Sequence, residues 1–291
     1  MRLPVRHIGL TIFFALPMLG FVLCPAANAQ GFRPRVAQAQ RVAPVVSQNF
    51  IVRANDARLA QKVSIEAERF RKELAIEWTG KELPAWSDKC PIQVEIGMHA
   101  GGETSFAFVS DQTGRGQPID WRMKIFGPPD RLLDAVLPHE VTHTIFATYF
   151  GRPLPRWADE GACTTVEHES ERQKNHRMLM DFLSASPSRG IPFNRMFTMR
   201  KYPHDILPLY AQGYSLAKFL ILQKGKRHFL DYVGNGMNYE STGHSLRAWD
   251  RATQEFTTTA IFLIFKLLGW TGLKKEVPNR HFKIKWSIQT G

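Results

Sequence analysis

The longest regular hydrophobic pattern in the chain lies between residues 56 and 78. Asp56 is a residue type that favours helix N-caps, and Gly80 is a residue type that ends helices. The apolar positions between them are three or four residues apart and would share one helix face: Leu59, Val63, Ala67, Phe70, Leu74 and Trp78. The pattern predicts an amphipathic helix over 56–78 that buries this face.

Segments with the pattern of strands flank this helix. Apolar and polar residues alternate over 90–97, and the segments 104–109 and 121–127 are also typical of strands, separated by the turn-rich sequence DQTGRGQP. A short strand is expected before the helix, in NFIVRAND at 49–56. The fold class we predict is α+β, with a small mixed sheet packed on the helix of residues 56–78.

The second half of the predicted domain is mostly helical. A helix over 131–151 is expected to be capped by Asp130 and ended by Gly151, with Pro138 kinking it or starting a fresh turn. Two further helices are predicted over 160–183 and 209–225. We therefore expect one domain over 49–235, followed by a carboxyl-terminal extension over 236–291 of unclear role.

The amino end has the three-part layout of a secretory signal peptide over residues 1–29. Arg2 and Arg6 precede a continuous apolar run, and Ala27-Asn28-Ala29 forms a small-x-small cleavage site. We predict an exported protein, periplasmic, cell-surface or extracellular, with no stable membrane span after cleavage. An uncleaved anchor is the alternative. Residues 30–48 lack a steady period and are interpreted as a flexible spacer.

Composition adds limits on partners and redox state. The net charge of +12 is scattered except near the carboxyl end, and an exported protein rarely meets nucleic acid, so we expect a solvated basic surface and no nucleic-acid partner. The oligomeric state is not predicted. Removal of the signal leaves Cys90 and Cys163, which form either one disulfide or two buried free thiols.

The sequence LPHEVTH contains the pattern His-Glu-x-x-His. On a helix, His139 and His143 share one face and can reach a single ion, while Glu140 can take a proton from a zinc-bound water. A catalytic zinc needs a third protein ligand and a fourth position for water. Phe146 and Tyr149 stand where a metzincin has glycine and histidine, which excludes that class.

The longer stretch PHEVTHTIFATYFGRPLPRWADEGA resembles the gluzincin metallopeptidases, in particular the peptidase MA-like group. The resemblance covers roughly residues 90–235 and implies a gluzincin-type catalytic domain that holds one Zn²⁺. It implies that Glu160 is the third zinc ligand and Glu140 the general base. It also implies a tyrosine of the downstream helix as oxyanion donor; Tyr210 is favoured over Tyr214.

These residues predict a zinc-dependent metallopeptidase that acts on a peptide or protein substrate. One alternative is a zinc amide hydrolase that acts on cell-wall crosslinks. Another is a cell-surface binding or scaffolding protein with a structural zinc, for which Cys163 would be the fourth ligand. Asp159 is expected either to orient a histidine ring or to cap a helix.

Overall fold

The computed structural model describes residues 42–110 and 116–240, and these residues form two compact parts. The first, called the sheet part, contains the described residues up to Pro153 together with Val166–His168. The second, called the helical part, contains Leu154–Thr165 and the described residues from Glu169 onward. The predicted single domain over 49–235 therefore consists of two compact units.

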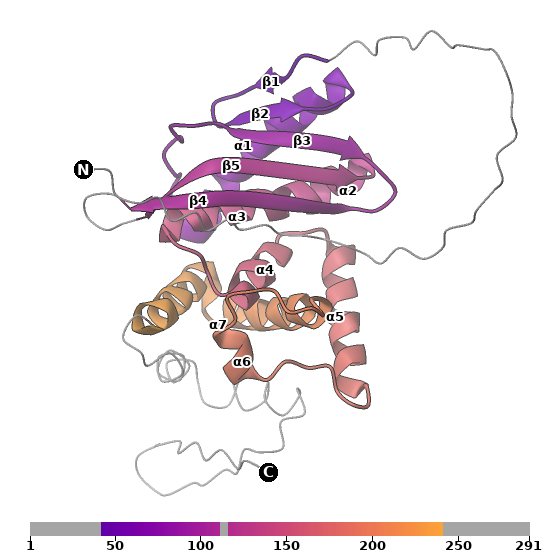
Figure 1. The fold of residues 1–291 in the computed structure, drawn as a ribbon, viewed down its shortest axis with the longest axis vertical. Helices are drawn as coiled ribbons and strands as arrows, with labels where there is room; N and C mark the ends of the chain where they lie inside the picture. The colour runs from indigo at the N-terminus through magenta and orange to yellow at the C-terminus, as the bar shows by residue number, and fades with distance from the viewer. Residues whose placement is uncertain (1–41, 111–115, 241–291) are drawn as a thin grey trace, which may run out of the picture. The chain divides into compact units, whose positions relative to one another are not determined.

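The sheet part is built on a five-stranded mixed sheet with the order β1-β2-β3-β5-β4 (Figure 1). Strands β2, β3 and β5 are parallel neighbours, while β1 and β4 pair antiparallel at the two edges. The bounds are β1 Val45–Val46, β2 Phe50–Arg53, β3 Cys90–Ile96, β4 Gly101–Ser110 and β5 Gly116–Gly127. The predicted strands and the α+β class with a mixed sheet are thus confirmed.

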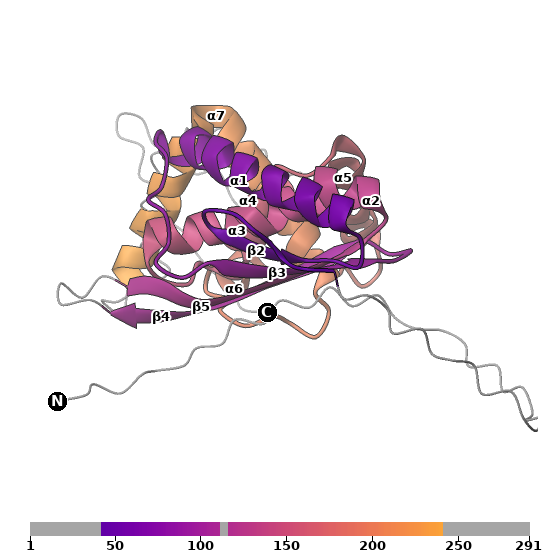
Figure 2. The ribbon, with the colours of Figure 1, turned by 90° about the horizontal axis from the view of Figure 1, so that it is seen from above.

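Helix α1, Ala57–Thr79, confirms the predicted amphipathic helix. The Asp56 carboxylate accepts a hydrogen bond from the Leu59 amide at 2.7 Å, and Gly80 closes the helix in the left-handed region at φ 80°. Figure 2 shows α1 and α3, Leu137–Phe150, on the same face of the sheet. The rings of Trp78 and Phe146 pack edge to face between these two helices, 5.0 Å apart.

The segment before α3 is not one regular helix. It consists of α2, Pro129–Arg131, followed by η1, Leu132–Val136, a turn of π-helix. Pro138 lies in the first turn of α3, and the helix changes from π to α directly before it, at the position where the sequence predicts a kink or a fresh turn. The predicted Asp130 cap is wrong, because the N-cap residue is Pro128 and no side chain caps this end.

The helical part contains α4, Arg156–Thr164; α5, Glu169–Ser184; α6, Phe193–Phe197; and α7, Leu207–Glu240. The predicted single helix over 160–183 is wrong, because the chain leaves the helical conformation over 165–168. Helices α4 and α7 cross closely: a Cβ on Gly161 would lie 2.2 Å from the Gly213 carbonyl oxygen. Gly225 interrupts α7 with φ 85° and ψ 171°.

Both predicted flanking segments need adjustment. The predicted spacer over 30–48 extends too far, because Val45–Val46 form β1 and pair with β2. The predicted boundary at 235/236 falls inside α7. The predicted signal peptide and residues 241–291 lie outside the described residues. Among the helices of the described ranges, no candidate combines the length and apolar character needed to span a membrane.

Candidate metal centre

Helix α3 carries the His-Glu-x-x-His pattern in a buried environment. His139, Glu140 and His143 are each no more than 2% exposed. The rings of His139 and His143 lie on one face, with centroids 4.9 Å apart, as the four-residue spacing predicts. Two imidazoles removed from bulk water and this close are suited to share one metal ion.

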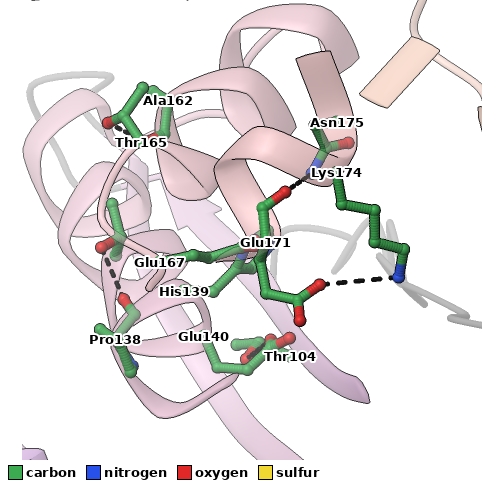
Figure 3. Close-up of polar contacts among 11 residues, drawn as sticks. Thr104, Pro138, His139, Glu140, Ala162, Thr165, Glu167, Glu171, Lys174 and Asn175 are labelled. Atoms are coloured by element: carbon green, nitrogen blue, oxygen red, sulfur yellow. Dashed lines mark hydrogen bonds and ion pairs between the residues drawn. The ribbon is translucent and has the colours of Figure 1, made fainter. Parts of the chain in front are cut away.

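A carboxylate orients the first of these rings. Nδ1 of His139 lies 2.6 Å from Oε1 of Glu167, which belongs to the break between α4 and α5 (Figure 3). A carboxylate oxygen accepts from an imidazole N–H, so this contact favours the proton on Nδ1; in the neutral ring, Nε2 then has the lone pair that binds a metal. This pairing adds negative charge beside the ring and raises its basicity.

The sequence did not reveal the contact of Glu167 with His139, because Glu167 was predicted to lie within one continuous helix over 160–183. The carboxylate of Asp159 has the Arg156 guanidinium 3.9 Å away, within α4. The predicted role of Asp159 in orienting a histidine ring stays a prediction. The other prediction for Asp159, a helix cap, is wrong, because the N-cap residue of α4 is Pro155.

Strand β4 contacts the side chain of Glu140. The Thr104 hydroxyl donates a hydrogen bond to Oε2 of Glu140 at 2.6 Å, and Figure 3 shows the two side chains turned toward one another. A Cβ on Gly102 would lie 2.4 Å from Oε1 of the same carboxylate. The sequence identified 104–109 as a strand but gave no signal that Thr104 contacts the expected base.

Helix α4 holds Glu160 in the helical part, where it is fully buried. Its Oε1 accepts a hydrogen bond from the Tyr202 hydroxyl. That hydroxyl accepts one from Nη1 of Arg156 at 3.2 Å, and the Arg156 guanidinium lies 4.3 Å from the centroid of the Tyr202 ring. Burial first and then the charge of Glu160 raise the pKa of Tyr202, so this hydroxyl stays a donor.

His139, His143 and Cys163 form a buried group that could hold a metal ion, with ligand atoms within 4.8 Å of one another. Both predicted histidines belong to this group; its third member is Cys163 where Glu160 was expected. Cys90 and Cys163 are both buried and form no disulfide, so the disulfide alternative is wrong. Burial and the charge of Glu140 raise the pKa of Cys90, which keeps that thiol protonated.

The two tyrosines considered as oxyanion donors lie on α7. Tyr210 and Tyr214 are both buried, at 4% and 2% exposure. The ammonium group of Lys218 lies 5.6 Å from the centroid of the Tyr214 ring. The role of Tyr210 stays a prediction.

No protein-family model matches this chain, and no significant match is found among curated proteins. The function therefore has to be argued from the residues of the site itself.

Proposed function

We propose that this chain is an exported zinc-dependent metallopeptidase of the gluzincin type, which hydrolyses peptide bonds in peptide or protein substrates. The observation that carries the proposal is the buried pair His139 and His143 on α3, with Glu140 between them in the sequence and Glu167 on the first ring. Zinc prefers such neutral imidazoles when a carboxylate fixes the ring that binds it. One zinc per chain is expected, and Glu160 would be the third ligand.

The proposed reaction divides among the zinc ion and three side chains. When bound, zinc would polarise the scissile carbonyl and acidify a water molecule. Glu140 would take the proton of the attacking water and later pass it to the leaving amine. Tyr210 would donate a hydrogen bond to the oxygen that becomes negative as the carbonyl is attacked. Glu167 would keep the His139 ring in the tautomer that binds metal.

Glu140 favours a catalytic site over a structural one. A site that only ties the fold together has no use for a carboxylate next to its first histidine, and burying one has a cost. Here the Glu140 carboxylate is 1% exposed and held by a strong hydrogen bond from Thr104. A zinc amide hydrolase for cell-wall crosslinks would use the same chemistry and differ only in substrate.

The second candidate function is a cell-surface binding or scaffolding protein with a closed, structural zinc site. The observation in its favour is the third member of the metal group, Cys163, since thiolates are common ligands of structural zinc. Four protein ligands, His139, His143, Glu160 and Cys163, would leave no position for water.

The deciding experiment measures bound zinc and hydrolysis of a mixed peptide library, in the parent and in Glu140→Gln. We expect one zinc per chain in both proteins and hydrolysis only in the parent. Glu73→Gln is the matched control, since Glu73 lies at an exposed site on α1, and it should behave as the parent. Zinc in both proteins with hydrolysis in neither would favour the structural site, and a parent that binds no zinc would refute both candidates.

Cobalt substitution separates the two ligand sets. Thiolate ligation gives Co²⁺ an intense sulfur-to-metal charge-transfer absorption in the near ultraviolet, whereas nitrogen and oxygen ligands do not. The metallopeptidase proposal predicts a spectrum without this band, unchanged in Cys163→Ser. A strong band that disappears in Cys163→Ser would identify Cys163 as a ligand and support the closed site.

A further inference from the structure

Two residues on one face of strand β4, Gly102 and Thr104, contact or make space for the Glu140 side chain. Residues 102 and 104 are two apart, so they point to the same side of the sheet. Both are buried, and Thr104 is completely inaccessible. Pairing with β5 fixes their backbone: Gly102 lies opposite Ile125 and Thr104 opposite Met123.

Thr104 fixes one oxygen of the carboxylate. The 2.6 Å distance from its hydroxyl to Oε2 of Glu140 falls in the range of charge-assisted O–H···O⁻ hydrogen bonds. A β-branched side chain on a paired strand has few rotamers, so the position of the donor is well defined. Glutamate has three side-chain torsions, and this hydrogen bond selects among the orientations that they allow.

Gly102 leaves the space that the other end of the carboxylate occupies. A Cβ at this position would lie 2.4 Å from Oε1, 2.7 Å from Cγ and 2.8 Å from Cδ of Glu140. Real atoms do not approach this closely, so any larger residue would displace the Glu140 side chain. The absence of a side chain at 102 and the hydroxyl at 104 therefore define one position for the Glu140 carboxylate.

We propose that Thr104 and Gly102 are positioning residues for the reaction: they hold Glu140 in the orientation in which it acts as the general base. The proposal rests on the proposed metallopeptidase function. Proton transfer requires the base within hydrogen-bond reach of the attacking water. A base that rotates among orientations spends part of its time out of reach, and small misplacements are costly in rate.

The test compares Thr104→Val, Thr104→Ser and Gly102→Ala with the parent for kcat, KM, zinc content and thermal stability. Thr104→Val removes the hydroxyl and keeps the shape, and Gly102→Ala displaces the carboxylate. We expect kcat to fall about 10- to 100-fold in both, with KM and zinc content unchanged. Thr104→Ser should restore most of kcat, because it restores the donor.

Thr79→Val is the matched control. Thr79 is a buried threonine of α1 whose hydroxyl lies 2.8 Å from the Ala75 carbonyl oxygen. It should lower thermal stability without changing kcat, which shows the effect of losing a buried hydroxyl alone. Should Thr104→Val fail to fold, Gly102→Ala and Thr104→Ser decide the question by the same readouts.

A double-mutant cycle separates positioning from a general structural role. In the Glu140→Gln background, Thr104→Val should cause no further loss in the residual rate, since both changes act through one carboxylate. An active parent with an unchanged kcat in Thr104→Val or Gly102→Ala would overturn the positioning roles alone, as would a loss that persists in the Glu140→Gln background. A zinc-bound parent that hydrolyses no substrate would overturn the proposed function, and this inference with it.

Discussion

The sheet part and the helical part hold the buried carboxylates of Glu140 and Glu160 in different ways. In the sheet part, Glu140 is held by Thr104 of a paired strand, a neutral donor on a rigid element. In the helical part, Glu160 is held by Tyr202, which itself accepts from the cation Arg156. Under the proposed function, the first arrangement suits a general base, because a neutral donor on a paired strand fixes its orientation. In the second arrangement, a guanidinium supports the hydroxyl that donates to the proposed zinc ligand.

The same difference in hydrogen-bond partners occurs within the sheet part, between His139 and Glu140. His139 is oriented by the acceptor Glu167, whereas Glu140 beside it is oriented by a donor. The partners differ in kind: Glu167 offers an acceptor to the imidazole, and Thr104 offers a donor to the carboxylate. Breaking these partners one at a time tests whether the two carboxylates have the roles assigned to them.

The largest effect is expected from His143→Ala. Removing one of two imidazoles on α3 should abolish stable zinc binding, and hydrolysis should be lost with it. Metal analysis after dialysis and an assay of peptide hydrolysis measure both consequences. His228→Ala is the matched control, because His228 is exposed on α7. Full zinc occupancy in His143→Ala would show that the metal does not bind at the histidines of α3.

The role proposed for Glu160 in the helical part is tested by identifying the third zinc ligand. If Glu160 is the ligand, Glu160→Gln should lower zinc affinity by more than the about 10- to 100-fold typical of losing a supporting partner, and Cys163→Ser should change it little. Competition with a chromogenic chelator measures both affinities. The reverse ranking would assign the metal to Cys163 and make the helical part the source of a thiolate ligand.

Glu167→Ala should have a smaller effect than the loss of a ligand. Without the carboxylate, the His139 ring can adopt either tautomer and becomes less basic, so zinc affinity should fall about 10- to 100-fold. Glu167→Gln should lose less, because its amide oxygen still accepts from Nδ1. Isothermal titration with zinc gives both values; an unchanged affinity in the alanine variant would show that Glu167 does not support the metal.

The features predicted correctly from the sequence depend on local periodicity. Those that were missed depend on a break between two helices or on contacts between residues far apart in the sequence. The helix of residues 56–78 and the helical spacing of His139 and His143 follow from residues three and four apart, and both predictions are confirmed. Glu167 was missed because it lies in a short break between two helices, and the sequence on both sides has a helical pattern. Thr104 and Tyr202 were missed because each contacts its glutamate from a distant part of the sequence, 36 and 42 residues away.

The smallest effect is expected from Tyr202→Phe, which removes the hydroxyl that links Arg156 to Glu160. A hydrogen bond to a charged group contributes about 1.5–3 kcal/mol, but the phenyl ring keeps its contact with the guanidinium, so the free energy of unfolding should fall by about 1–2 kcal/mol. Zinc affinity should fall only slightly, because the ionised Glu160 remains. Denaturant unfolding and zinc titration of the same variant measure the two effects. A loss of zinc binding as large as that in Glu160→Gln would show that the hydroxyl fixes the ligand as firmly as Thr104 is proposed to fix the base, and the contrast between the two parts would then disappear.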